Sequence, residues 1–217
     1  MGRALLAAGA HLLQHRGPLG AFGVYVAGLH CGRDDPSLQM EAHHWCAQSN
    51  DDLLQCVVFD GNTEEANLIG IEYIVSERLY ATLPEEERGL WHPHNYEVLS
   101  GQLVAPGLPP AAEHALMRVL VNSYGKTWHT WHTGTHATGP GHPLPFGPAM
   151  PMWSFNRDGE ADPAIERDFL AGMGIDLARS RARRADLLEH ARPQQGVDRL
   201  ADAFPLGTPI PGVIEAG

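Results

Sequence analysis

Short runs of β-branched, aromatic and aliphatic residues dominate the chain from about residue 22 to residue 153. They occur at 21–29, 53–59, 67–76, 96–104 and 127–133. Each run is bounded by Gly, Pro, Asn or Asp, the residues that end strands and form turns. The pattern predicts an α+β protein with one mainly antiparallel sheet, flanking helices and, as one arrangement, barrel-like closure of the sheet.

Helical spacing of apolar residues occurs in four other segments. They are 4–15, 76–90, 111–123 and about 162–192. The first predicts a short amphipathic helix. In the second, Pro84 and the three glutamates after it suit a helix N-terminus. The last is interrupted near Gly172 and Gly174, so we expect a break there.

The composition changes beyond Gly159, where Ala, Arg and Asp replace the short β-rich runs. We therefore expect a core domain over residues 1–160 and a helical extension over 161–217 that wraps the core. Residues 134–151 contain five prolines and four glycines. This density predicts a structured loop rather than a regular element.

Composition and charge exclude several classes of protein. The 217 residues are 43% hydrophobic and 19% charged, which is typical of a globular protein, and no apolar run is long enough to span a membrane. A formal charge of -11 disfavours binding to nucleic acid. The three cysteines, Cys31, Cys46 and Cys56, form no C-x-x-C pair, and we expect reduced thiols and a cytoplasmic location.

The chain carries 13 histidines, and the segment WHPHNYE at 91–97 has the sharpest pattern. On a strand, His92 and His94 share one side and can chelate the same ion. Two imidazoles and a carboxylate form the facial triad of non-haem iron sites or, with water, a catalytic zinc site. Strict alternation places Glu97 on the opposite side, so it is a ligand only if a turn or bulge intervenes.

Further candidate residues lie in three other runs. His43 and His44 are adjacent and point opposite ways, so at most one should face the same site. His129 lies between two tryptophans and is either a ligand, a base or a packed core residue. Glu72 interrupts an apolar run, where it faces solvent or orients a ligand histidine. Lys126 is the only lysine of the chain.

The common catalytic fingerprints are absent from the sequence. There is no nucleophile elbow, dinucleotide fingerprint or zincin helix, and Leu120 stands where a phosphate-binding loop would need glycine. The H-x-H pair followed by Glu97 and Gly101 is distantly similar to the first metal motif of cupins, although here the spacing is compressed. Two surface histidines before a strand are the structural alternative.

Six linked motifs resemble the oil body-associated protein family, also known as DUF1264, and suggest a bacterial-type member. They are EAHHW at 41–45, QC at 55–56, LIGIEYIVS at 68–76, LPEEE at 83–87, LWHPH at 90–94 and YGKTWH at 124–129. The resemblance covers roughly residues 5–155 and departs from the family pattern after Trp131. It implies an association of plant members with seed lipid bodies, and it implies no reaction.

These observations support three hypotheses. The first is a metal-binding protein, interpreted as a small hydrolytic or oxidative metalloenzyme for a small, partly apolar substrate. Its Fe, Cu or Zn ion would be held by His92, His94 and either His43 or His44, assisted by Glu97 or His129. Glu72, Lys126 and His129 are its candidate catalytic residues, and Trp91, Trp128 and Trp131 its apolar wall.

The second hypothesis is a non-catalytic protein associated with lipid bodies, in weak contact with a lipid surface through the helix predicted at 4–15. The third is that the histidines only scaffold the fold and regulate assembly. The sequence leaves open whether the protein is an enzyme and whether it forms homo-oligomers.

Overall fold

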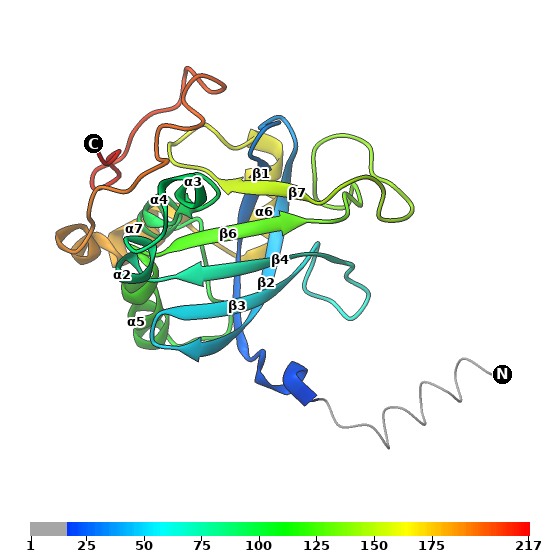
Figure 1. The fold of residues 1–217 in the computed structure, drawn as a ribbon, viewed down its shortest axis with the longest axis horizontal. Helices are drawn as coiled ribbons and strands as arrows, with labels where there is room; N and C mark the ends of the chain where they lie inside the picture. Colours follow the sequence, from blue (N-terminus) through cyan, green and yellow to red (C-terminus); the bar gives the residue numbers. More distant parts are fainter. Residues whose placement is uncertain (1–16) are drawn as a thin grey trace.

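The computed structural model describes residues 17–217 and shows a closed antiparallel barrel (Figure 1). Its six strands are β1 Val24–Gly32, β2 Gln39–Asn50, β3 Leu53–Phe59, β4 Leu68–Val75, β6 Tyr124–His129 and β7 Met150–Ser154. They follow the order β4-β3-β2-β1-β7-β6, and pairing of β4 with β6 closes the ring. The two-residue strand β5, His92–Pro93, adds to β6 where β7 has ended. The predicted α+β class and antiparallel sheet are confirmed.

One predicted strand is wrong. Residues 96–100 of the run at 96–104 lie in helix α4, Asn95–Ser100. Gly101 ends the helix with a φ of 87°, a left-handed conformation that glycine adopts without strain. Gly101 therefore caps a helix, and it does not close a hairpin as in the cupin motif. Strand β2 is absent from the predicted runs, because polar residues such as Glu41 and Gln48 interrupt its apolar pattern.

The helices are short and gather mostly at one end of the barrel (Figure 1). They are η1 Gly17–Ala21, α2 Glu77–Tyr80, α3 Glu85–Arg88, α5 Pro110–Leu120, α6 Pro163–Met173, α7 Leu177–Arg183 and η2 Ala185–Glu189. The helix predicted at 76–90 is thus two separate helices, divided at Pro84. The helix predicted at 4–15 lies outside the described residues. From residue 17 onward, no helix has the length and apolarity required to cross a bilayer.

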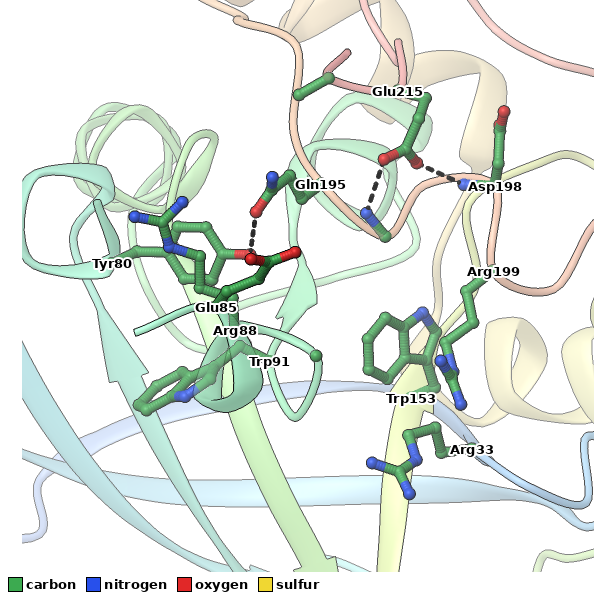
Figure 2. Close-up of a pocket in the computed structure, with 13 residues that line it drawn as sticks. Arg33, Tyr80, Glu85, Arg88, Trp91, Trp153, Gln195, Asp198, Arg199 and Glu215 are labelled. Atoms are coloured by element: carbon green, nitrogen blue, oxygen red, sulfur yellow. Dashed lines mark hydrogen bonds between the residues drawn. The ribbon is translucent and has the colours of Figure 1, made fainter. Parts of the chain in front are cut away.

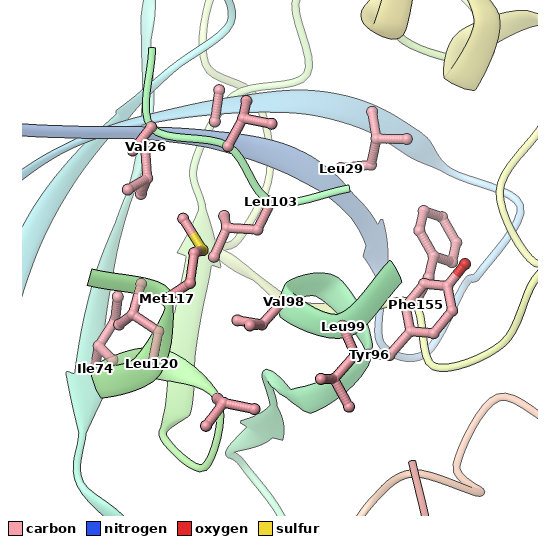
Figure 3. Close-up of a cluster of buried hydrophobic side chains, with 14 of the residues drawn as sticks. Val26, Leu29, Ile74, Tyr96, Val98, Leu99, Leu103, Met117, Leu120 and Phe155 are labelled. Carbon is pink, nitrogen blue, oxygen red and sulfur yellow. The ribbon is translucent and has the colours of Figure 1, made fainter. Parts of the chain in front are cut away.

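Helices α4 and α5 close the same end of the barrel with apolar side chains. Val98 of α4 and Met117 and Leu120 of α5 are buried, and they belong to one cluster with Val26 and Ile74 of the barrel wall (Figure 3). The apolar plug removes water from this end of the interior. Polar groups that point into the barrel beside it therefore depend on one another for partners.

The segment 161–217 packs against the barrel wall through α6 and over the helical end through its later part (Figure 1). Its buried side chains Phe169, Leu187 and Leu200 belong to the same apolar cluster as the barrel and plug. The side chain of Arg184 is also buried and donates hydrogen bonds to the carbonyl oxygens of Val98 and Leu103. The extension thus contributes to the core, and that it is a separate unit from 1–160 remains a prediction.

The expectation that all cysteines are reduced is wrong. Cys46 and Cys56 form a disulfide between directly paired residues of β2 and β3, and Cys31 is a buried free thiol. The pairing follows from the antiparallel register, which places the two side chains opposite each other. Disulfides of this kind form in oxidising surroundings.

Docking of the extension can be tested by truncating one buried and one exposed apolar side chain of this segment. Phe169 of α6 is fully buried, and Phe169→Ala should lower the free energy of unfolding by about 3–5 kcal/mol because it leaves a cavity. Leu206 is 91% exposed in the same extension, and Leu206→Ala should change it by less than about 0.5 kcal/mol. Urea denaturation measures both, and equal effects would contradict a docked extension.

Candidate metal centre

Four strands of the barrel each place one ionisable side chain in its interior. They are His30 on β1, His44 on β2, Glu72 on β4 and His129 on β6, all at most 3% exposed. Side chains alternate between the two faces of a strand, so the neighbours of these residues in sequence face the outside. Closure of the barrel then brings together residues that are far apart in the chain.

Strand β5 and helix α4 add three more ionisable groups. His92 is in β5, His94 is the N-cap residue of α4, and Glu97 lies in its first turn. Residues three apart on a helix lie on the same side, and the Nε2 atom of His94 is 4.0 Å from Oε2 of Glu97. The helix therefore supplies the turn that lets Glu97 face the same space as His94.

Three donor atoms converge at the centre of this cluster. The Nε2 atoms of His92 and His94 are 3.2 Å apart, and Oε1 of Glu72 is 3.3 Å from His94 and 3.7 Å from His92. Two nitrogens bound to a tetrahedral ion at about 2.0–2.1 Å lie about 3.3 Å from each other. The three atoms therefore have the spacing of ligands on one face of a coordination tetrahedron.

Gly125 on β6 makes this convergence sterically feasible. A Cβ atom at this position would lie 2.4 Å from Oε1 of Glu72 and 2.5 Å and 2.6 Å from the Nε2 atoms of His92 and His94. These contacts are shorter than real Cβ atoms show, so any other residue would force the three side chains to shift. The glycine leaves the side of the strand that faces the three donor atoms free of atoms.

The second oxygen of Glu72 faces a different set of rings. Its Oε2 atom is 2.8 Å from Nε2 of His44 and 3.7 Å from Nε2 of His30. The Nδ1 atom of His30 is 3.3 Å from Nε2 of His129, whose Nδ1 atom is 3.0 Å from the sulfur of Met40. Glu72 thus lies between two groups of histidines.

A hydrogen bond fixes the ring of His94. Ser123 donates its hydroxyl proton to the carbonyl of Leu120, so the Nδ1–H of His94 donates to Oγ of Ser123, at 2.8 Å. This tautomer leaves the lone pair of Nε2 directed at His92 and Glu72. Ligand histidines in metal sites are oriented by the same kind of partner.

Several buried polar atoms of the cluster have no hydrogen-bond partner among residues 17–217. They are both ring nitrogens of His44, Nδ1 of His92 and Oε2 of Glu72. Buried polar atoms are nearly always satisfied, so such a group needs an explanation. The cluster adjoins a cavity of about 10 Å³ that is lined by His30, His44, Glu72, His94 and Glu97 among others. This volume is about that of one water molecule.

Burial keeps His30, His92 and His129 neutral. It lowers the pKa of His30 and of His92 well below the usual value, and it lowers the pKa of His129 to about 3. Desolvation disfavours the charged imidazolium form. A neutral imidazole carries a free lone pair, which is the form that binds metal ions.

The two carboxyl groups shift in opposite directions. Burial alone would raise the pKa of Glu72, but the rings of His44, His94 and His92 hold it well below its usual value. Burial and the charge of Glu72 raise the pKa of Glu97 well above its usual value. The anionic group is therefore the one that lies between the histidines.

Two residues proposed from the sequence lie outside the barrel wall. His43 faces the opposite side of β2 from His44, where its ring nitrogens lie 2.8 Å from the hydroxyl of Tyr25 and 3.2 Å from a carboxylate oxygen of Glu41. Lys126 forms an ion pair with Glu87 and lies over the ring of Trp128. Strand alternation separates both residues from the buried cluster.

His30 was not among the ligands proposed from the sequence. It is an isolated histidine in an apolar run, without a second histidine at metal-ligand spacing. The sequence feature that could have identified His30 is strand alternation, because Val26, Gly28 and His30 lie on one face of β1. Only the arrangement of the other strands in the closed barrel shows that this face of β1 is part of the polar interior.

A larger cleft lies nearby, outside the barrel wall. It has a volume of about 620 Å³, and its lining includes Arg33, Arg199, Trp91 and Trp153 (Figure 2). Trp153 stands beside the cluster as well, because its ring centre is 5.8 Å from that of His92. Of the three tryptophans proposed as an apolar wall, only Trp91 lines this cleft.

The fold and the cluster define a class: an antiparallel β-barrel with a buried centre of histidines and carboxylates. Residues 16–188 match the family described as "Protein of unknown function (DUF1264)", and the chain belongs to this family. No solved structure matches the chain.

Two plant proteins are among the relatives of this chain. The chain is 34% identical to Oil body-associated protein 1B of Arabidopsis thaliana, over 93% of this chain and 80% of the relative. It is 36% identical to Oil body-associated protein 1A of Zea mays, over 93% of this chain and 82% of the relative. Both are plant proteins, and neither supports the assignment to a bacterial type.

Gly125 provides a test of the packing at the centre. Gly125→Ala should lower the free energy of unfolding by about 1–3 kcal/mol or more, because the new methyl group overlaps three buried polar groups. Gly89 has open space around it and a φ of -64°, so Gly89→Ala should be tolerated. Thermal denaturation of both variants makes the comparison. Equal stability of the two would show that the centre is not packed as described.

Proposed function

We propose that this protein associates with the surface of lipid bodies and that it holds a divalent metal ion inside its barrel. The two parts rest on different observations and are tested separately. The names of the relatives support the first part more directly. Each name refers to an association with oil bodies, and neither refers to a metal or a reaction. The geometry of the interior supports the second part.

An apolar belt on the outside of the barrel supports contact with a lipid surface. Directly paired residues of five strands form it, namely Tyr25, Trp45, Val57, Ile71 and Trp128. All five are partly or largely exposed, and Leu68 and Tyr73 beside them are 51% and 38% exposed. Contiguous apolar surface of this kind marks an interaction site.

The character of the belt matches the boundary between lipid and water. Tyr25 stacks on Trp45 with ring centres 4.6 Å apart, and Phe59 packs against the edge of the same tryptophan. Aromatic rings with one polar atom are favoured where an apolar phase meets water. The net charge of -11 disfavours anionic lipid, so the surface we expect is neutral.

Flotation with artificial droplets tests this part. Droplets of triacylglycerol coated with phosphatidylcholine should carry the protein into the floating fraction. The double substitution Trp45→Glu and Ile71→Glu should reduce the bound fraction at least about tenfold, because burying two apolar side chains contributes several kcal/mol. Residues 1–16 stay unchanged in this variant, so the belt alone is tested.

Leu206 supplies the matched control for flotation. It is 91% exposed in the extension, away from the belt, and Leu206→Glu should leave flotation unchanged. A wild-type protein that stays wholly in the aqueous fraction would exclude lipid association. Equal losses in the control and in the double variant would exclude the belt as the contact surface.

The donor set of the interior supports binding of a metal ion. His92, His94 and Glu72 offer two imidazole nitrogens and one carboxylate oxygen at ligand spacing, and Glu97 is within reach. The neutral ring of His92 and the anionic carboxylate of Glu72 are the protonation states that a divalent ion requires. An ion at this point would also compensate the charge of the buried Glu72 carboxylate.

The chemistry of the donors narrows the choice of ion. Nitrogen and carboxylate ligands suit zinc, iron, manganese and copper, and two histidines with one carboxylate are typical of non-haem iron. No cysteine sulfur joins the cluster among the described residues, because Cys46 and Cys56 bond to each other and Cys31 approaches the carbonyl of Trp153. The donor set is therefore not that of a structural zinc–thiolate site.

The size of the interior limits what this ion does. A cavity of about 10 Å³ has room for about one water molecule beside the ligands. A small organic substrate has no space there in the described conformation. Our proposal is therefore metal binding, and it includes no reaction. In this proposal Glu72 is a metal ligand. Lys126 lies outside the barrel interior and has no role in metal binding.

Metal-dependent stability tests this part. After treatment with a chelator, addition of Zn(II) or Mn(II) to about 100 times the dissociation constant should add about 2.7 kcal/mol of stability. For a chain of this length this corresponds to a rise in Tm of about 5–11 °C. Glu72→Gln keeps the side-chain volume but loses the anionic ligand, so its Tm should not rise with metal.

Glu160 supplies the matched control for this experiment. It is another buried carboxylate, and it accepts hydrogen bonds from the backbone of Asn156 and Arg157 outside the cluster. Glu160→Gln should lower the starting Tm and keep the increase on metal addition. If neither Zn(II) nor Mn(II) changes the Tm of the wild-type protein, metal binding is contradicted.

A further inference from the structure

We propose that the interior holds two metal ions, bridged by the carboxylate of Glu72. This inference rests on the proposed metal binding and adds a second ion to it. The first ion lies among His92, His94 and Glu97 on the side of Oε1. The second lies between His30 and His44 on the side of Oε2.

The division of the donors around Glu72 carries this inference. Oε1 faces the Nε2 atoms of His92 and His94, at 3.7 Å and 3.3 Å. Oε2 faces the Nε2 atoms of His30 and His44, at 3.7 Å and 2.8 Å. The two oxygens of one carboxylate can each bind a different ion, and carboxylates bridge the ions of dinuclear sites in this way.

The number of donor atoms exceeds what one ion uses. Two triads with metal-ligand spacing are present, His92, His94 and Glu97, and His30, Glu72 and His92. The Nε2 atom of His92 has one lone pair and serves one ion only. If His92 serves the first ion, His44 is the nearest ring that can replace it beside Oε2 of Glu72.

Three of the four unsatisfied atoms of the cluster lie on the side of the second ion. Nε2 of His44 and Oε2 of Glu72 lie 2.8 Å apart without a well-aligned hydrogen bond, and Nδ1 of His44 has no partner within residues 17–217, although all three atoms are buried. A single ion among His92, His94 and Glu97 leaves these atoms without a partner. An ion between Oε2 and the two Nε2 atoms gives Glu72 and His44 the interaction that burial otherwise removes.

His129 has a supporting position in this arrangement. Its Nε2 atom lies 3.3 Å from Nδ1 of His30, so it orients the ring whose other nitrogen faces Glu72. Its own Nδ1 atom contacts the sulfur of Met40. We therefore treat His129 as a positioning residue and not as a ligand of either ion.

Metal stoichiometry of the full chain tests the inference. Protein freed of metal with a chelator is dialysed to equilibrium against Mn(II), and bound Mn is measured by elemental analysis. Two ions per chain are expected. One ion per chain would overturn the bridged pair and leave single-ion binding intact, whereas none would overturn both. Paramagnetic resonance should show a spin-coupled pair, because bridged ions lie about 3.5–4 Å apart.

Adjacent histidines of β2 provide the matched variants. His44→Gln removes a ligand of the second ion and should halve the bound Mn and restore the six-line spectrum of isolated Mn(II). His43→Gln changes a histidine that is equally buried but faces the outside, and it should keep two coupled ions. His30→Gln repeats the test if the first variant does not fold. Two coupled ions in both His44→Gln and His30→Gln would overturn the inference.

Discussion

Burial of the Glu72 carboxylate is the constraint on which the interior of the barrel depends. A carboxylate enclosed by protein is stable only when charge and hydrogen-bonding groups compensate for the water that it has lost. Here imidazoles from separate segments of the chain approach both of its oxygens. Neutral imidazoles donate hydrogen bonds but carry no charge, and this shortfall is what a bound cation would supply. The same constraint accounts for Gly125, which any larger residue would push into the carboxylate.

At the level of Glu72, the inner surface of the barrel is polar and the outer surface is apolar. Glu72 points inward among polar groups, while its neighbour Ile71 belongs to the apolar belt outside. Soluble barrels more often bury apolar side chains and expose polar ones. This reversal is confined to one level, because Ile74 and Val26 near the helical plug face inward in the usual manner. Lipid contact outside and metal binding inside can therefore share the same strands without sharing side chains.

Helix α4 connects the plug to the buried centre. His94 and Glu97 face the centre, while Val98 and Leu99 belong to the apolar cluster that closes the barrel. The extension supports this helix, since Arg184 donates to the carbonyl of Val98. Packing at the end of the barrel thus fixes the position of two candidate ligands.

Sequence periodicity determined the antiparallel sheet, the helices at 111–123 and beyond residue 162, and the pairing of His92 with His94, because these depend on neighbours within a few residues. The alternation of strands also showed that His43 and His44 face opposite ways. Only the tertiary structure decided which faces form the interior. His30, His44, Glu72 and His129 meet because β4 pairs with β6 across the closed ring, a contact between segments about 55 residues apart. Glu97 joins them because its segment buries Val98 and Leu99 best as a helix, and this preference is set by the plug that it packs into and not by its own sequence pattern.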